Sequence, residues 1–269
     1  MFVAHTATGA VEVIDGARGV HRATLPGCPE SSGVLCAQEE HLIFAAARGA
    51  GKILVIGARS RDVIKNIIVG PNPNGLGWDS RRKRLLVVDV QDFRARLIDP
   101  YAGAVVTEGE LPGRPRWCVY DPTADRWLVN IKAPACVASL AAETLVGQAR
   151  WPVSSAGPHG LDLDVEHGRA FVACDGGKVI AADLASGREL AGVAIAGAPD
   201  AIWYNADRAY LYVAIGQPGV LDVVDTKEMV LVQEIVTEAG AHTTAFDQAR
   251  QRLYLFLPRS RQAVVYEEN

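Results

Sequence analysis

Short apolar runs rich in Val, Ile and Leu alternate with turn residues along the whole chain. Examples are ILVIG at 53–57, LLVVD at 85–89 and YLYVA at 210–214. No window has apolar residues at three-to-four spacing between residues that could cap a helix. The pattern therefore predicts strands joined by turns throughout, with no helical layer.

The strands are organised in a repeating unit. Six apolar segments align, and the differences between their starts are 42, 42, 43, 41 and 42 residues. A period in this range is typical of solenoids, arrays and propellers. The six segments begin at Gly33, Gly75, Trp117, Gly160, Ala201 and Thr243.

Each unit contains four short runs. The first run ends in most copies at an Asp or Asn, and a polar turn leads to the second run; in four copies an Arg stands five residues after that position. Three copies then continue Asp-x-x-x-Gly after the third run, which predicts a hairpin with the chain reversal at the Gly. We therefore predict a single all-β domain over 1–269, a β-propeller of four-stranded antiparallel blades. The three hairpins are Asp15–Gly19, Asp99–Gly103 and Asp183–Gly187.

Several of these strands resemble those of the YVTN-type propeller repeat family. FVAH at 2–5, LLVVD, WLVN at 127–130 and YLYVA resemble the LYVTN strand of that family, and VEVID at 11–15 and LDVVD at 221–225 resemble its VSVID strand. The resemblance covers essentially the whole chain and implies a seven-bladed propeller. Relatives include surface-layer modules, lactonase-like enzymes and lyases. The terminal asparagine of the family's strand stands here at Asn130.

The number of blades is less clear than the fold. Seven second strands and seven third strands can be counted, but only six first strands. Seven blades leave one blade without its first strand, whereas six blades would use HRATL at 21–25 to complete the last blade. We favour seven blades, and we expect the N-terminal and C-terminal strands to pair and close the ring.

Composition limits the classes of function. The net charge of −4 argues against a surface built for nucleic acid, and the basic run at 81–84 is best explained as a solvated turn. No apolar stretch is long enough for a membrane-spanning helix. The N-terminal segment lacks the pattern of a signal peptide, and five scattered cysteines suggest a reducing compartment. These features together predict a cytoplasmic protein.

Candidate functional residues precede the first strands. In a propeller these strands line a central channel, and ligands usually bind at its mouth. The residue just before each first strand is polar in all six copies, which predicts a binding site for a small molecule or a protein partner. The six residues are Ser32, Asn74, Arg116, His159, Asp200 and His242.

Three of these residues also suggest a metal or an acid–base pair. Imidazoles with a carboxylate suit a divalent metal ion, so His159, Asp200 and His242 form a candidate metal site. The same three residues are the catalytic candidates, because acid–base chemistry needs a His and a carboxylate within hydrogen-bond reach. Polar residues at a channel mouth are also expected with no function at all.

Two strand-end residues and two glycine-containing segments are weaker candidates for a ligand site. Asp89 and Asn130 end neighbouring second strands and could contribute to the ligand site, although ordinary strand-end turns explain them as well. RGAGK at 48–52 and DGGK at 175–178 faintly resemble phosphate loops, but neither has a Ser or Thr after the Lys, so both are predicted to be turns.

Two functions are compatible with these features. The first is a propeller without a catalytic motif that binds a ligand or a protein at the channel mouth. The second is a lactonase-like or lyase-like enzyme that uses His159, Asp200 and His242, with or without a metal. The sequence does not specify the ligand, the oligomeric state or the pathway.

Overall fold

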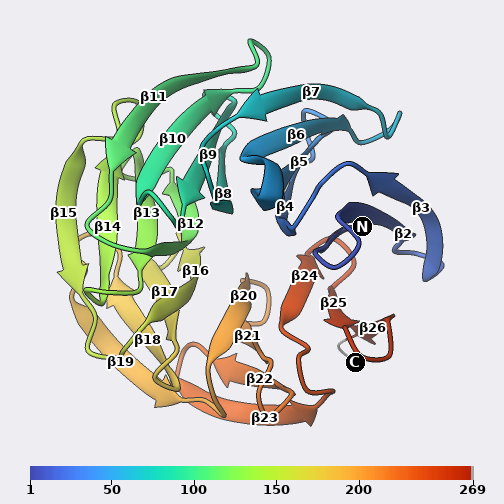
Figure 1. Ribbon diagram of the computed structural model, residues 1–269. Coiled ribbons are helices and arrows are strands. Elements are labelled where there is room, and N and C mark those ends of the chain that lie inside the picture. Colours follow the sequence, from blue (N-terminus) through green and yellow to red (C-terminus); the bar gives the residue numbers. More distant parts are fainter. Residues whose placement is uncertain (268–269) are drawn as a thin grey trace. The chain divides into compact units, whose positions relative to one another are not determined.

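The computed structural model describes residues 1–267 and contains strands and turns, with one short 3-10 turn, η1 (Arg48–Ala50). Twenty-six strands form seven antiparallel sheets (Figure 1). The fold is all-β, a β-propeller with seven blades, as the repeat predicted. No helix among the described residues has the length and apolar character needed to span a membrane.

Strands with the same position in the repeat recur in every complete sheet. The first strands are β4 (Ser31–Ala37), β8 (Pro73–Asp79), β12 (Pro115–Asp121), β16 (Pro158–Asp164), β20 (Pro199–Asn205) and β24 (Thr243–Asp247). The second strands are β1 (Phe2–His5), β5 (Leu42–Ala47), β9 (Arg84–Asp89), β13 (Arg126–Ile131), β17 (Arg169–Cys174), β21 (Tyr210–Ile215) and β25 (Arg252–Leu257).

The third and fourth strands follow in the same order. The third strands are β2 (Ala10–Asp15), β6 (Lys52–Gly57), β10 (Arg94–Asp99), β14 (Cys136–Ala141), β18 (Lys178–Asp183), β22 (Val220–Asp225) and β26 (Gln262–Glu267). The fourth strands are β3 (Val20–Pro26), β7 (Val63–Ile68), β11 (Ala104–Glu110), β15 (Gly147–Pro152), β19 (Glu189–Ala194) and β23 (Val230–Val236).

The two terminal sheets are smaller than the others. Five sheets have four strands, but β1–β2–β3 and β24–β25–β26 have three each. By position in the repeat, the first of these sheets has no first strand and the second has no fourth strand among the described residues. The pairing of the N-terminal and C-terminal strands stays a prediction.

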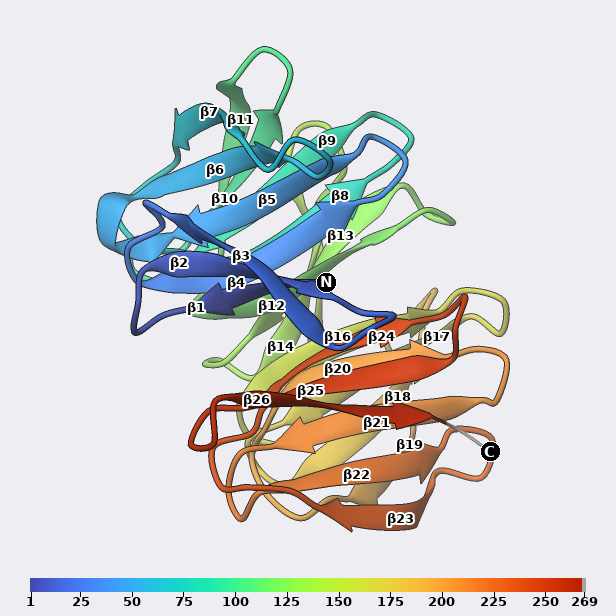
Figure 2. The same cartoon turned by 90° about the vertical axis from the view of Figure 1, so that its right-hand side faces the viewer.

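The chain divides into two compact units. Unit 1 comprises Met1–Val129 and Ala138–Ala149, and unit 2 comprises Asn130–Val137 and Arg150–Asn269. The β16–β19, β20–β23 and β24–β26 sheets belong to unit 2 (Figure 2).

The second strands form the buried centre of each unit. All six residues of β5 are buried, and so are all six of β13. In unit 2, Phe171 and Val213 belong to the core between the β16–β19 and β20–β23 sheets, and Leu253 belongs to the core between β20–β23 and β24–β26. Fully burying such a side chain contributes about 1.5–3 kcal/mol. Apolar contact on both faces explains why these strands read as continuous apolar runs.

The predicted hairpins form as expected. The amide of Gly103 donates to the carbonyl of Asp99 at 2.8 Å, and Gly103 has a φ of 75°, in the left-handed region that favours glycine. The Asp99 carboxylate accepts the amide hydrogens of Tyr101 and Ala102, which fixes the loop. The same Gly-to-Asp bond of 2.8 Å recurs at Asp15–Gly19 and Asp183–Gly187.

The Asp and the Arg five residues later pair in only some copies. Arg126 lies 2.9 Å from Asp121, and Arg169 lies 2.7 Å from Asp164, with both carboxylates buried. In the other two copies the Arg contacts an acid on the third strand instead, in the pairs Arg84–Asp99 and Arg252–Glu267.

Candidate functional site

Three first strands of unit 2 bring the predicted residues together. β16, β20 and β24 lie side by side (Figure 1), and His159 and Asp200 occupy equivalent positions at the start of β16 and β20, while His242 directly precedes β24. Close approach of β16 and β20 is possible because residue 160 is glycine: a Cβ at Gly160 would lie 2.7 Å from the Asp200 carbonyl oxygen.

The three side chains form a hydrogen-bonded series. Nε2 of His159 lies 3.0 Å from Oδ1 of Asp200, and Nδ1 of His242 lies 2.6 Å from Oδ2 of the same carboxylate. On its other side, Nδ1 of His159 lies 2.9 Å from Oδ1 of Asp175. Nζ of Lys132 lies 2.8 Å from Oδ2 of Asp175. We call these five residues the His–Asp cluster.

The hydrogen bonds of the cluster determine the charge of its two carboxylates. His159 faces a carboxylate with each ring nitrogen, Asp175 at Nδ1 and Asp200 at Nε2. Burial raises the pKa of Asp200, but hydrogen bonds from His159 and His242 outweigh burial and hold this pKa well below its ordinary value. Burial likewise raises the pKa of Asp175, and its bonds from Lys132 and His159 lower it further than burial raises it. Both carboxylates are therefore ionised at neutral pH.

His242 is the accessible end of the cluster. Its side chain is 49% exposed, against 15% for His159. The hydrogen bond to Asp200 raises the pKa of His242, and partial burial opposes that shift. Within residues 1–267, Nε2 of His242 has no hydrogen-bond partner. This nitrogen can donate to a ligand when protonated or accept a proton when neutral.

Sequence reasoning missed Asp175 and Lys132. Asp175 belongs to the DGGK segment, for which the sequence predicts only a turn, and it does lie in the turn after β17. The signal that could have found it is antiparallel pairing, because the start of a first strand lies opposite the end of a second strand. Pro158 pairs with Cys174, so His159 and Asp175 are both chain neighbours of one cross-strand pair, and the register shifts directly after it, between Pro158 and Leu161.

The two predicted strand-end residues are buried within the fold. Nδ2 of Asn130 donates to the carbonyls of His159 and Gly160, at 3.1 and 2.9 Å, so Asn130 supports the backbone beneath the cluster. The Asp89 carboxylate accepts amide hydrogens from Asn72 and Gln91 and is 1% exposed. Asp89 therefore holds the turn that follows its own strand, whereas Asn130 holds backbone of the neighbouring sheet. The assignment of both residues to a ligand site stays a prediction.

The other predicted ligand residues belong to unit 1. Oγ of Ser32 donates to the carbonyl of Pro73 at 2.9 Å. The side chain of Asn74 accepts a hydrogen bond from Arg48 of η1. Arg116, at the start of β12, is partly buried. Their assignment to a ligand site stays a prediction.

The metal assignment also stays a prediction. The described residues contain no group of three or more His, Cys, Asp or Glu side chains arranged to hold a metal ion. Both oxygens of Asp200 are already engaged by imidazole nitrogens. A metal at His159, Asp200 and His242 would have to replace these two hydrogen bonds.

Asp162, on β16, is a carboxylate that the sequence did not select as a site residue. Asp162 accepts the amide hydrogen of Leu163 at 2.8 Å and that of Tyr204 at 2.7 Å. Burial raises the pKa of Asp162 to about 6, although these two bonds oppose the shift. The group links β16 to β20, the same two strands that carry His159 and Asp200.

Comparisons with known proteins define the fold. No protein-family model matches the chain, and no curated protein matches it. Among solved structures, the dihydro-heme d1 dehydrogenase NirN, in complex with DHE, is similar with a TM-score of 0.77 and 16% identity over 100% of this chain and 61% of its own. The hydrazine synthase of Kuenenia stuttgartiensis is similar with a TM-score of 0.63 and 11% identity, over 87% of this chain and 94% of its own.

These two similarities support the β-propeller fold but no particular family or activity. The chain spans about three-fifths of the length of the NirN chain. The resemblance to the YVTN repeat family is not matched by any family model. At such low identity, the conclusion from the comparisons is the β-propeller fold.

Proposed function

We propose that unit 2 binds a small, carboxylate-bearing molecule at the His–Asp cluster. The observation that carries the proposal is the half-exposed His242, whose Nδ1 is held by Asp200 while its Nε2 has no partner in the described residues. A ring fixed at one nitrogen presents the other in a defined direction, so it can donate to a ligand oxygen without further ordering.

The charge of the cluster favours an anion. The hydrogen bond to Asp200 raises the pKa of His242 and so favours its cationic form, and Lys132 supplies a second cation. Lys132 is 40% exposed and stands at the opposite end of the series from His242. Charge-assisted hydrogen bonds from these two ends are suited to carboxylates.

The comparison with NirN supports a ligand of small-molecule size. That protein is named a dihydro-heme d1 dehydrogenase, and its structure contains a bound DHE molecule. A protein that contains a propeller of this fold therefore binds a small molecule. On that ground, tetrapyrroles with carboxylate groups belong among the ligands to be tested.

Calorimetric titration tests this proposal. The probes are short mono-, di- and tricarboxylates and a carboxylate-bearing porphyrin, added to the wild type and to His242→Gln and His167→Gln. His167 is the matched control, because its Nδ1 lies 3.0 Å from the Asp164 carboxylate and its side chain is 58% exposed. We expect saturable binding that His242→Gln weakens about tenfold or more and His167→Gln leaves unchanged. Absence of binding by every probe would overturn the proposal.

Acid–base catalysis is the second candidate. The 2.6 Å bond between His242 Nδ1 and Asp200 Oδ2 orients the ring as in a His–carboxylate dyad, with Nε2 left for proton transfer. Lactone hydrolysis or a lyase reaction would use His242 in this way. Turnover of simple lactones that His242→Gln abolishes would favour this candidate, and turnover unaffected by that change would exclude His242 as the base.

A further inference from the structure

A further set of equivalent residues directly follows the second strands. The end of a second strand lies opposite the start of the first strand in the same sheet, as in the pair Ser31–Ala47. The residue after each second strand therefore lies at the same edge of the sheet as the candidate residue at the start of the first strand. These residues are Thr6, Arg48 and Val90 in unit 1 and Lys132, Asp175, Gly216 and Pro258 in unit 2.

In unit 2 the cation of this set has a counter-ion. Nζ of Lys132 lies 2.8 Å from Oδ2 of Asp175, which occupies the equivalent position in the next sheet. In unit 1 the cation is Arg48, and the equivalent residue of the next sheet is Val90, which cannot pair with it. Among residues 1–267, the guanidinium of Arg48 pairs with no acid and bonds only to the neutral side chain of Asn74. Arg48 is therefore a partly buried cation without a counter-ion.

The contact between Arg48 and Asn74 leaves donors open. A guanidinium can only donate, so the Asn74 atom that faces Nη2 of Arg48 is Oδ1, and Nδ2 is left as a donor. Nε of Arg48 is buried and has no hydrogen-bond partner in the described chain. Nη1 of Arg48 and Nδ2 of Asn74 also lack a partner there, and neither atom is buried. A cationic donor and an amide donor are therefore open to solvent on two joined side chains.

The backbone around this pair is fixed. The amide of Gly51 donates to the carbonyl oxygen of Arg48 at 3.1 Å, which closes the turn after β5. In the neighbouring sheet, β8 lies close to β4, and a Cβ at Gly33 would lie 3.0 Å from the carbonyl oxygen of Asn74. Donors held in this way lose little conformational freedom when a ligand binds.

The charge at this edge of unit 1 favours an anion. Arg116, at the start of β12, is a second cation at the edge. Glu30 packs on Gly49 of the turn after β5, but it is exposed and makes no ion pair with Arg48 in the described chain. Partial burial of a cation without a counter-ion is unfavourable, and an oxyanion would offset that cost. The equivalent positions of unit 1 include no acid: they are Thr6, Ser32, Arg48, Asn74, Val90 and Arg116.

We propose that unit 1 binds a small oxyanion, the oxygen atoms of a phosphate or a carboxylate group, at Arg48 and Asn74. Nη1 of Arg48 supplies a charge-assisted hydrogen bond, and Nδ2 of Asn74 donates a second bond to the same group. The anion takes the role for Arg48 that Asp175 has for Lys132 in unit 2. The proposal does not rest on the ligand proposed for the His–Asp cluster.

Nitrogen-15 NMR of the Arg48 guanidinium and the Asn74 side-chain amide tests this. The probes are inorganic phosphate and acetate, and sodium chloride at matched ionic strength controls for screening. Asn74→Asp is the sharpest variant, because it gives Arg48 an internal carboxylate in place of the anion. Arg48→Gln removes the cation. Lys52→Gln is the matched control, because it removes a charge from the other end of the same turn, where Lys52 lies opposite Ala47.

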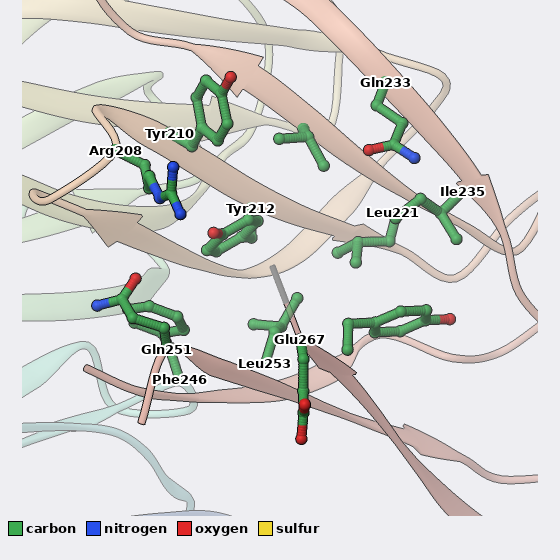
Figure 3. Close-up of a pocket in the computed structure, with 12 residues that line it drawn as sticks. Arg208, Tyr210, Tyr212, Leu221, Gln233, Ile235, Phe246, Gln251, Leu253 and Glu267 are labelled. Carbon is green, nitrogen blue, oxygen red and sulfur yellow. The ribbon is translucent and has the colours of Figure 1, made fainter. Parts of the chain in front are cut away.

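A cavity in unit 2 offers another cation to a probe. It has a volume of about 430 Å³ and lies between the β20–β23 and β24–β26 sheets (Figure 3). Its lining includes Arg208, Tyr212 and Glu267. Arg208→Gln is therefore a second control, which shows whether the anion binds in this cavity instead.

We expect phosphate, acetate or both to shift the Arg48 and Asn74 resonances in a saturable way that chloride does not reproduce. Arg48→Gln and Asn74→Asp should weaken this binding about tenfold or more, measured at whichever of the two side chains remains. Lys52→Gln and Arg208→Gln should leave it unchanged. Because the shifts are measured at Arg48 and Asn74, the result is independent of whether the His–Asp cluster binds a carboxylate.

Two results would overturn the proposal. The first is the absence of a saturable shift with both probes, or equal affinity of the wild type and Asn74→Asp. The second is loss of binding in Arg208→Gln with binding retained in Arg48→Gln, which would place the anion in the cavity of unit 2.

Discussion

Nδ1 of His242 lies 2.6 Å from Oδ2 of Asp200, and this contact joins the start of one first strand to the start of its neighbour. The bond raises the pKa of His242 above its ordinary value. It also fixes the ring so that Nε2 faces away from the carboxylate. The electrostatics of the cluster and its proposed binding of a ligand both depend on this pair.

The first prediction concerns this pKa. An NMR titration should find His242 with a higher pKa than an unstructured histidine, and Asp200→Asn should return it toward that value, because the neutral amide no longer favours the imidazolium. Since the folded pKa is raised, the stabilisation is fully present below the unfolded pKa and is lost as pH rises through the folded pKa. A wild-type His242 that titrates at or below the ordinary value contradicts the assignment.

The spacing of β16 and β20 gives a second prediction. Gly160→Ala would place a Cβ 2.7 Å from the Asp200 carbonyl, so the strands must separate. We expect a loss of about 1–3 kcal/mol in the free energy of unfolding and a weaker His159–Asp200 bond. Gly147→Ala is the control, because nothing lies within 4 Å of a Cβ there. Urea denaturation of both variants measures the difference, and equal stability would refute the close approach.

Asp162 should titrate well above Asp200, the carboxylate on the neighbouring strand. Burial raises its pKa to about 6, whereas the pKa of Asp200 is lowered. In carbon-13 carboxyl spectra, Asp162 should change near pH 6 and Asp200 should stay ionised well into acid. A folded pKa above the unfolded one means that Asp162 destabilises the protein as pH rises toward 6. An ordinary pKa for Asp162 would show that solvent reaches it.

The buried pair in unit 1 gives a fourth prediction. Arg126 and Asp121 are 9% and 0% exposed, so Arg126→Met leaves a carboxylate buried without its cation. Removing one partner of such a pair costs about 3–5 kcal/mol. The control is Arg250→Met, which breaks an exposed pair with Asp247 and should cost about 0–1 kcal/mol. Similar losses in the free energy of unfolding for the two variants would show that the buried Arg126–Asp121 pair stabilises the protein no more than an exposed pair does.

Much of the fold follows from the repeat. A period near 42 residues and the turn residues between apolar runs are enough to predict the first strands that start near Gly75 and Gly160 and the hairpin reversal at Gly103. The ends of the chain are harder. The sequence has seven second strands but only six first strands, and the structure correspondingly has three strands in each of the two terminal sheets.

The candidate site is predictable in part. Position in the repeat is sufficient to select His159, Asp200 and His242, because residues at equivalent positions meet when first strands lie side by side. Asp175 is missed when its segment is compared with phosphate loops rather than placed beside the start of β16, where Pro158 pairs with Cys174. The burial of Asn130 is not predictable either, since the direction of its side chain depends on backbone groups of the neighbouring sheet.

The central claim is that His242 contacts a bound carboxylate through Nε2. Nitrogen-15 NMR of the imidazole, recorded while the tightest carboxylate probe is added, tests this most directly. We expect the Nε2 resonance of His242 to shift with the same dissociation constant that calorimetry gives, while His167 does not change. A saturated complex in which the His242 resonances stay where they were would contradict the account.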